Sequence, residues 1–192
     1  MAGAQEQRRL AAIVAADVVG YSRLVAADES GTLARLQALR RDIVDPAIAR
    51  HAGRLFKAMG DGLLVEFGSA VQAVSCARAI QESNRSGLDL RIGVHLGDVI
   101  VQEDDLMGDG VNIAARLERI ADPGGIALSR QVYDQVRDRL DLVFDDRGEV
   151  ELKNLARPVH VFAVGGTRPP ASAGLALPDK PSIAVLPFDN MS

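Results

Sequence analysis

Residues 10 to 19 read LAAIVAADVV, an apolar run interrupted only by Asp17. Such a run is typical of a β-strand that is buried on both faces of a sheet. A carboxylate at the end of a buried strand is costly unless a cation or a hydrogen-bond donor compensates for it. Asp17 is therefore either a cap for the turn at Gly20-Tyr21-Ser22 or a ligand for a hard cation such as Mg²⁺.

Outward from this strand, helical and strand patterns alternate. Leucines at helical spacing predict an amphipathic helix at 33–43, which Pro46 kinks or ends. GRLFKAMGDGLLVEF, at 53–67, predicts a hairpin that turns at Gly60-Asp61-Gly62. The later segments are expected to be a helix around Cys76, two strands within 88–102 meeting near Gly97, a polar loop at 103–110, a helix at 111–121, a short helix near 129–138, and strands at 141–153 and 158–164.

This order predicts an α+β sandwich, in which helices cover a mixed or antiparallel sheet. We expect a flexible segment at 1–8 and one folded domain at 9–165. A linker rich in Gly, Pro, Ala and Ser follows at 166–181, and 182–192 reads as the first strand of a truncated second domain.

Composition and charge limit the classes of function. A formal charge of -4 over 192 residues argues against a general nucleic-acid surface. The single cysteine lies among apolar residues at helical spacing, so we expect a core thiol, no disulfide framework and no multi-cysteine metal site. No apolar stretch reaches about 18 residues and no signal peptide is evident, so we expect no membrane segment and a cytoplasmic location.

Several polar residues have both a structural and a chemical interpretation. Asp61 fits a plain Asp-Gly turn, but it can also meet Asp17 if the two strands are neighbours, and two carboxylates there suit a pair of metal ions. Asn112, Arg116 and Arg119 share one helix face, which is either solvated or directed at a ribose and phosphates. Lys57 and Lys153 are by default solvated lysines. The histidines have no metal-ligand spacing, and His95 is expected in the core.

Four motifs, in this order and spacing, resemble the catalytic domain of the class III adenylate and guanylate cyclases over about residues 8–165. They are ADVVGYS around Asp17, KAMGDG at 57–62, DLMGDGVNIAARLE at 105–118, and ELKNL around Lys153. No Walker, kinase or GxGxxG signature competes with them. The resemblance implies a ferredoxin-like βαββαβ-type sandwich.

The resemblance also implies roles for individual residues. Asp17 and Asp61 would bind two Mg²⁺ or Mn²⁺ ions, and the turn formed by Val18, Val19, Gly20, Tyr21 and Ser22 would lie against the phosphates. Lys57 and Asp105 would read the base, with Asp104 an alternative to Asp105. Asn112 would orient the ribose, Arg116 would stabilise transition-state charge, and Lys153 would contact the triphosphate.

Family members work as head-to-tail dimers with shared sites, so a homodimer is expected. An Asp acceptor and a Lys donor match adenine, which makes ATP the expected substrate and cyclic AMP the product. The alternatives are a guanylate cyclase that uses GTP, a regulatory domain that senses nucleotides without turnover, and a purely structural module. The tail KPSIAVLPFDNMS resembles a module that often follows bacterial cyclase domains, so a C-terminal regulatory or scaffold domain is expected.

Overall fold

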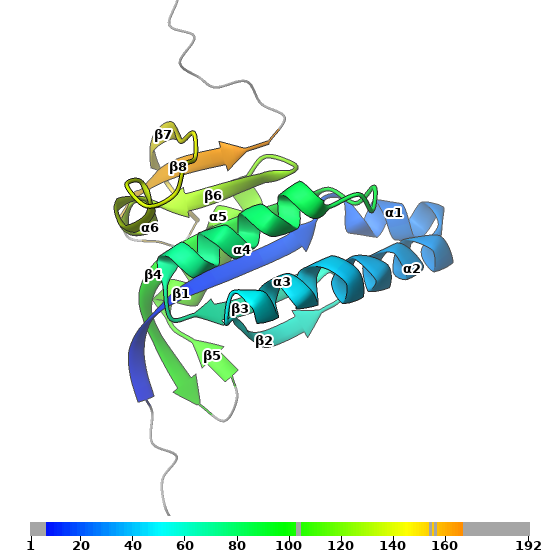
Figure 1. Ribbon diagram of the computed structural model, residues 1–192, viewed down its shortest axis with the longest axis horizontal. Helices are drawn as coiled ribbons and strands as arrows, with labels where there is room; N and C mark the ends of the chain where they lie inside the picture. The colour runs from blue at the N-terminus through cyan, green and yellow to red at the C-terminus, as the bar shows by residue number, and fades with distance from the viewer. Residues whose placement is uncertain (1–6, 103–104, 154, 156, 167–192) are drawn as a thin grey trace, which may run out of the picture.

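The computed structural model describes residues 7–102, 105–153, 155 and 157–166 (Figure 1). Its strands are β1 (Gln7–Val18), β2 (Arg54–Met59), β3 (Gly62–Phe67), β4 (Leu90–Gln102), β5 (Asp105–Met107), β6 (Gly125–Ser129), β7 (Asp145–Val150) and β8 (Val159–Gly165). Its helices are α1 (Tyr21–Ala27), α2 (Glu29–Leu39), the π-helical segment η1 (Arg40–Val44), α3 (Asp45–Arg50), α4 (Ala70–Ser83), α5 (Asp109–Ile120) and α6 (Arg130–Val136).

The strands form one mixed sheet with helices on both faces. Their spatial order is β2-β3-β1-β4-β6-β8-β7, and β5 pairs with β4. The β4–β6 pair is parallel, whereas the other described pairs are antiparallel. Figure 1 shows α2, α3 and α4 on one face and α5 on the other. The predicted α+β sandwich on a mixed sheet is confirmed.

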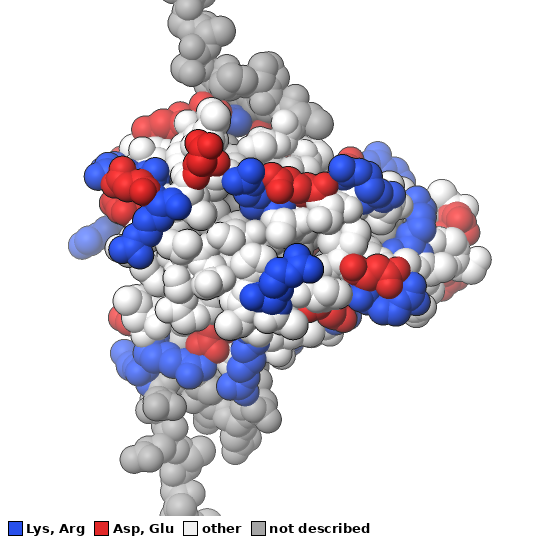
Figure 2. All heavy atoms as spheres, viewed as in Figure 1, with Lys and Arg blue, Asp and Glu red and all other residues white. Residues whose placement is uncertain are grey.

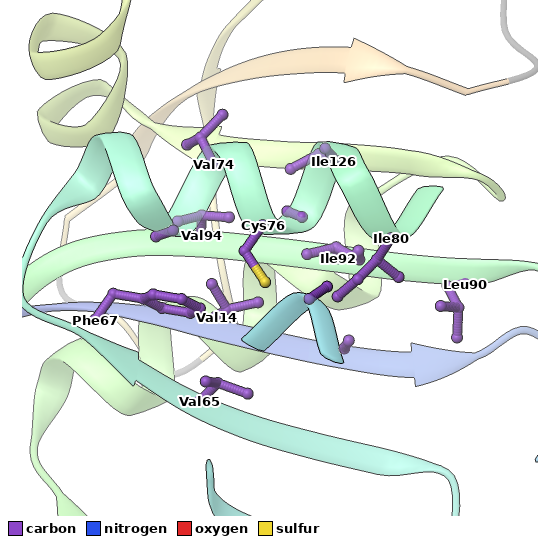
Figure 3. Close-up of a cluster of buried hydrophobic side chains, with 14 of the residues drawn as sticks. Val14, Val65, Phe67, Val74, Cys76, Ile80, Leu90, Ile92, Val94 and Ile126 are labelled. Carbon is purple, nitrogen blue, oxygen red and sulfur yellow. The ribbon is translucent and has the colours of Figure 1, made fainter. Parts of the chain in front are cut away.

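The first face is covered by helices that pack on the apolar side chains of β1, β3 and β4. Cys76 of α4 is 1% exposed and lies among aliphatic side chains and Phe67, as Figure 3 shows. Burial raises the pKa of its thiol to about 12, which keeps the thiol protonated and unreactive. The predicted core role of Cys76 is confirmed.

Pro46 does not end the helix that precedes it. The proline has no N–H, and its ring clashes with the carbonyl four residues earlier, so the α-helical hydrogen-bond register cannot run through it. The chain accommodates it with the π-helical turn η1, after which Pro46 lies in the first turn of α3. At the predicted kink the chain therefore changes from the α-helix α2 to the π-helical turn η1 and then to the α-helix α3.

On the second face, α5 lies directly on β4. A Cβ atom on Gly93 of β4 would be 2.2 Å from the backbone nitrogen of Glu118 and 2.3 Å from the carbonyl oxygen of Ala114. Only glycine permits this backbone-to-backbone contact. The position of α5 is therefore fixed by the strand beneath it.

Two local predictions were wrong, and one helix was missed. Residues 88–102 do not form two strands, because β4 continues through Gly97 as a single strand opposite β1. The polar loop predicted at 103–110 contains β5, which pairs with the end of β4 and is followed by the first residues of α5. The helix α1 was not predicted, since its seven residues include no buried side chain to give an apolar stripe.

Both ends of the chain bear on the predicted domain boundaries. Gln7 and Arg8 already belong to β1, so the expected flexible segment 1–8 was too long. Except for Gly166, the predicted linker at 166–181 and second domain at 182–192 lie outside the described residues.

Within the described ranges no helix is long and apolar enough to cross a membrane. Figure 2 shows acidic and basic side chains interspersed over the face that carries α2, α3 and α4.

His95 lies in β4 and is 4% exposed, as predicted for a core histidine. Its Nδ1 atom is 2.9 Å from the Ser129 hydroxyl. Burial lowers the pKa of the imidazole from 6.5 to about 4, because the charged form loses its hydration. The unfolded chain therefore binds a proton at a higher pH than the folded chain does.

From this difference we expect stability to be fully retained above about pH 6.5 and to fall as the pH drops toward about 4. The free energy of unfolding should decrease by up to about 3 kcal/mol from this group alone. Because the raised pKa of Glu118 favours the folded state as the pH falls, the decrease is measured as the difference between the wild type and His95→Gln in urea unfolding near neutral pH and at about pH 4.5. His95→Gln should flatten the dependence, and an unchanged slope in that variant would contradict the assignment.

Candidate functional site

Asp17 and Asp61 converge at one end of the sheet, as the sequence predicted for neighbouring strands. β1 and β3 are antiparallel with Ala16 opposite Leu63, so the turn before β3 lies beside the last residues of β1. The backbone N–H of Val18 donates to Oδ2 of Asp61 over 3.2 Å, which ties this turn to the end of β1. Both aspartates face an open pocket of about 600 Å³, which is also lined by Val18, Gly20, Tyr21, Ser22, Arg23 and Arg91.

The charge of Asp17 is compensated by Arg91, its direct partner across the β1–β4 ladder. Nε and Nη2 of Arg91 donate to Oδ1 and Oδ2 of Asp17 over 3.1 and 2.8 Å. Both carboxylate oxygens are thus engaged in a bidentate pair, the strongest arrangement for these groups. The pair raises the pKa of Arg91, so the guanidinium stays charged.

Glu118 of α5 adds a third carboxylate beside this pair. The residue is 9% exposed, and its Oε1 atom is 3.8 Å from Nη2 of Arg91. Burial raises the pKa of Glu118 well above its ordinary value, and the neighbouring charge of Asp17 raises it further. Glu118 is therefore largely protonated near neutral pH and adds little negative charge beside the Asp17–Arg91 pair.

The turn from Val18 to Ser22 has both occupied and free amides. The N–H of Val18 is bound to Asp61, and that of Val19 donates to the carbonyl of Asp89 over 2.8 Å. Gly20 has a φ of 66°, the left-handed region, and precedes the first turn of α1. The first amides of a helix have no partner within it, so those of Tyr21 and Ser22 are open to a ligand.

The other predicted residues gather around α5 instead. Asn112 and Arg116 lie on α5 itself, where Asn112 is exposed and Arg116 is half-buried. Nε of Arg116 is buried and has no hydrogen-bond partner among the described residues. Lys57 is exposed on β2, next to Phe56, which packs against the same buried cluster as Val111 and Ala115 of α5.

Asp105 and Lys153 are placed near α5 by the elements that carry them. Asp105 begins β5, opposite Gln102 on β4, and β5 contacts both α5 and β2. Lys153 is exposed and follows Leu152, which is buried against Leu117 of α5. Asp104 lies outside the described residues.

The chain therefore holds two separate groups of polar residues. Asp17, Asp61 and the turn line one pocket, and that pocket includes none of Lys57, Asn112, Arg116 or Lys153. Along α5, Asn112 lies six residues before Glu118, which is about 9 Å of helix rise. The sequence motifs imply metal and phosphate binding for the first group. They imply base, ribose, triphosphate and transition-state contacts for the second group.

Comparison with models of known protein families identifies the family of this chain. The model of the adenylate and guanylate cyclase catalytic domain matches residues 4–165. The chain belongs to this family. A Rhizobium meliloti (strain 1021) protein named "Putative adenylate cyclase 3" is 50% identical over 208 residues, a match that spans 100% of this chain but only 35% of the relative.

Solved structures agree with the cyclase assignment. An adenylate/guanylate cyclase/hydrolase from Silicibacter pomeroyi superposes with a TM-score of 0.77 at 40% identity, covering 83% of this chain and 98% of that one. The adenylyl cyclase CyaB from P. aeruginosa has the same fold, with a TM-score of 0.74 at 22% identity over 86% of this chain and 98% of its own.

Sequence reasoning missed Arg91, which lines the pocket, and Glu118, which lies beside it. Arg91 interrupts the apolar strand LDLRIGVHL, and that interruption is the signal that could have pointed to it, as the same signal did for Asp17. Glu118 gives no such signal, because its burial depends on the close approach at Gly93, which periodicity does not reveal.

Proposed function

We propose that this cyclase domain converts ATP to 3′,5′-cyclic AMP and pyrophosphate at sites shared by two copies of the chain. The observation that supports this most is the separation of the two residue groups. Lys57 and Asp61 are four residues apart, yet they belong to different groups. A head-to-tail homodimer would bring the first group of one copy against the second group of the other, giving two equivalent sites.

The first group fits a pair of divalent cations. Mg²⁺ and Mn²⁺ prefer oxygen ligands and are typically held by one or two carboxylates together with substrate phosphates. Asp17 and Asp61 supply such carboxylates, and the guanidinium of Arg91 already occupies a cationic position against Asp17. When bound, the two ions would polarise the α-phosphate and lower the pKa of the ribose 3′-hydroxyl.

The chain's own residues would position the substrate for an in-line displacement. The ribose 3′-hydroxyl gives up its proton to water or to a substrate phosphate as its oxygen forms a bond to the α-phosphorus, and the bond from that phosphorus to the β-phosphate oxygen breaks to release pyrophosphate. Arg91 and the open amides of Tyr21 and Ser22 face the phosphates, with Lys153 of the second copy. Asn112 of that copy would orient the ribose, and Arg116 would stabilise the charge that develops at the α-phosphate.

Base choice rests on Lys57 and Asp105, which would come from the same copy as Asn112. A carboxylate accepts from the N6 amino group of adenine, and an ammonium donates to its N1 atom. Guanine presents the reverse pattern and would leave both side chains unpaired.

We therefore expect the purified protein to prefer ATP over GTP by about 100-fold in kcat/KM with Mn²⁺. Separating cyclic AMP and cyclic GMP by chromatography measures the preference. Faster turnover of GTP would assign a guanylate cyclase. Normal ATP binding without any product, unchanged in Asp17→Ala, would assign a nucleotide sensor.

The cellular location of this domain and the presence of a further domain after it are also proposals. The chain spans about a third of the first curated relative, 35% of its length. We propose a cytoplasmic enzyme, where ATP and Mg²⁺ are present, with a further regulatory or scaffold domain after residue 181. The C-terminal sequence motif supports that domain.

A further inference from the structure

Arg23 lines the pocket of Asp17 and Asp61, and its charge is unused there. The residue is exposed in the first turn of α1, and none of the described residues forms a hydrogen bond or an ion pair with its guanidinium. Arg91, the other cation that lines this pocket, is bound bidentately to Asp17. Among the described residues that line the pocket, Arg23 is therefore the cation that no carboxylate compensates.

The side chain of Arg23 lies over Gly20, in the turn that leads into α1. The backbone N–H of Arg23 donates to the carbonyl of Gly20 over 3.0 Å, which places the two residues one helical turn apart. A Cβ atom on Gly20 would lie 3.0 Å from Nη2 of Arg23 and 3.7 Å from its Cζ and Nε atoms. Side chains of a helix point toward its N-terminus, so the guanidinium folds back onto the turn beside the pocket.

A triphosphate in this pocket requires an additional cation. The substrate is strongly anionic, and the two acids of the pocket, Asp17 and Asp61, repel it. The proposed metal ions offset this repulsion where they bind, and Arg91 already compensates Asp17. A guanidinium binds a phosphate group through two parallel N–H···O bonds, so Arg23 has both the charge and the geometry for such a contact.

We propose that Arg23 is a further substrate-binding residue, which binds the β- and γ-phosphates and so favours a triphosphate over a monophosphate. This assignment rests on the proposed function, in which Asp17 and Asp61 hold the ions at the α-phosphate. The second copy holds the base and the ribose, so the remaining phosphates extend over this chain's own turn. Arg23 follows that turn directly and contacts the part of the substrate that leaves as pyrophosphate.

Loss of the guanidinium should weaken the binding of a triphosphate selectively. In Arg23→Gln the Kd for the non-cleavable analogue α,β-methylene-ATP with Mn²⁺ should rise about tenfold, because one charge-assisted phosphate contact is lost. Isothermal titration calorimetry measures this Kd. The Kd for AMP, which has no β- or γ-phosphate, is measured by displacement of the analogue and should change by less than about twofold. Arg23→Lys keeps the charge but not the bidentate geometry, so its Kd for the analogue should be intermediate.

Arg50→Gln is the matched control for these measurements. Arg50 is an exposed arginine at the end of α3 and does not line the pocket, so its substitution should leave both Kd values unchanged. Because α1 has no buried side chain, Arg23→Gln should keep the fold, which far-UV circular dichroism checks. If that variant does not fold, Arg23→Lys carries the test. An unchanged Kd for the analogue, or an equal loss for AMP, would overturn the assignment.

Failure of this assignment is distinguishable from failure of the proposed function. Selective weakening in Arg23→Gln, in a protein that makes no cyclic nucleotide, supports the phosphate contact and overturns the cyclase activity. Cyclic AMP formation by the wild type, together with an unchanged Kd in Arg23→Gln, overturns the phosphate contact alone. A wild-type protein that binds neither nucleotide overturns both.

Discussion

Asp17→Asn should lower the rate of cyclic AMP formation on the order of 10³-fold at saturating ATP and Mn²⁺, which corresponds to about 4 kcal/mol of transition-state stabilisation. The substitution keeps the size of the side chain but removes the charge that both ions would share. It also removes the bidentate partner of Arg91, whose guanidinium would then compete with the ions as a free positive charge. Chromatographic measurement of cyclic AMP gives the rate.

Asp28→Asn is the matched control for this loss. Asp28 is an exposed aspartate whose side chain accepts from the backbone N–H of Gly31 at the start of α2. Because asparagine caps helices about as well as aspartate, this variant should keep both its stability and its activity. An Asp17→Asn protein that retains more than about a tenth of the wild-type rate would rule out Asp17 as a shared metal ligand.

Mixing two inactive variants should restore activity if the sites are shared. Arg116→Ala should be as inactive as Asp17→Asn, since Arg116 would stabilise the transition state from the second copy. In a mixed dimer both lesions fall in one site, and the other site is intact. Random exchange makes half of the dimers mixed, so about a quarter of the wild-type activity should return.

The recovered rate is read after the two variants have been refolded together, with each variant refolded alone as its control. Mixing Asp17→Asn with Asp61→Asn provides a second comparison, because both lesions belong to the same group and no intact site can form. Recovery in that second mixture, or none in the first, would contradict the division into two groups.

The sequence predicted the features that local patterns encode. A buried strand and an Asp-Gly turn each leave a clear pattern, and antiparallel pairing of β1 with β3 brings Asp17 and Asp61 to one edge. The faces of α5 were also readable, because helical periodicity separates Asn112 and Arg116 from the apolar stripe.

What the sequence did not reveal depends on register and on close backbone contacts. The partner of Asp17 follows from the alignment of β1 with β4, in which Arg91 is the opposite residue. The prediction of two strands within 88–102 did not include this continuous pairing of β1 with β4. Glu118 looks like an ordinary solvated acid in the sequence, and only the absent side chain at Gly93 brings it down onto the sheet.

The contact between Gly93 and α5 has a mechanical consequence. Because β4 and α5 meet backbone to backbone, they move as one rigid lever, with Arg91 and the aspartate pocket at one point and Asn112 at another. In the proposed head-to-tail pair these two points would belong to opposite sites. A rotation that tightened one of the proposed sites would then be transmitted through β4 and α5 to the other, so the two sites would not close independently.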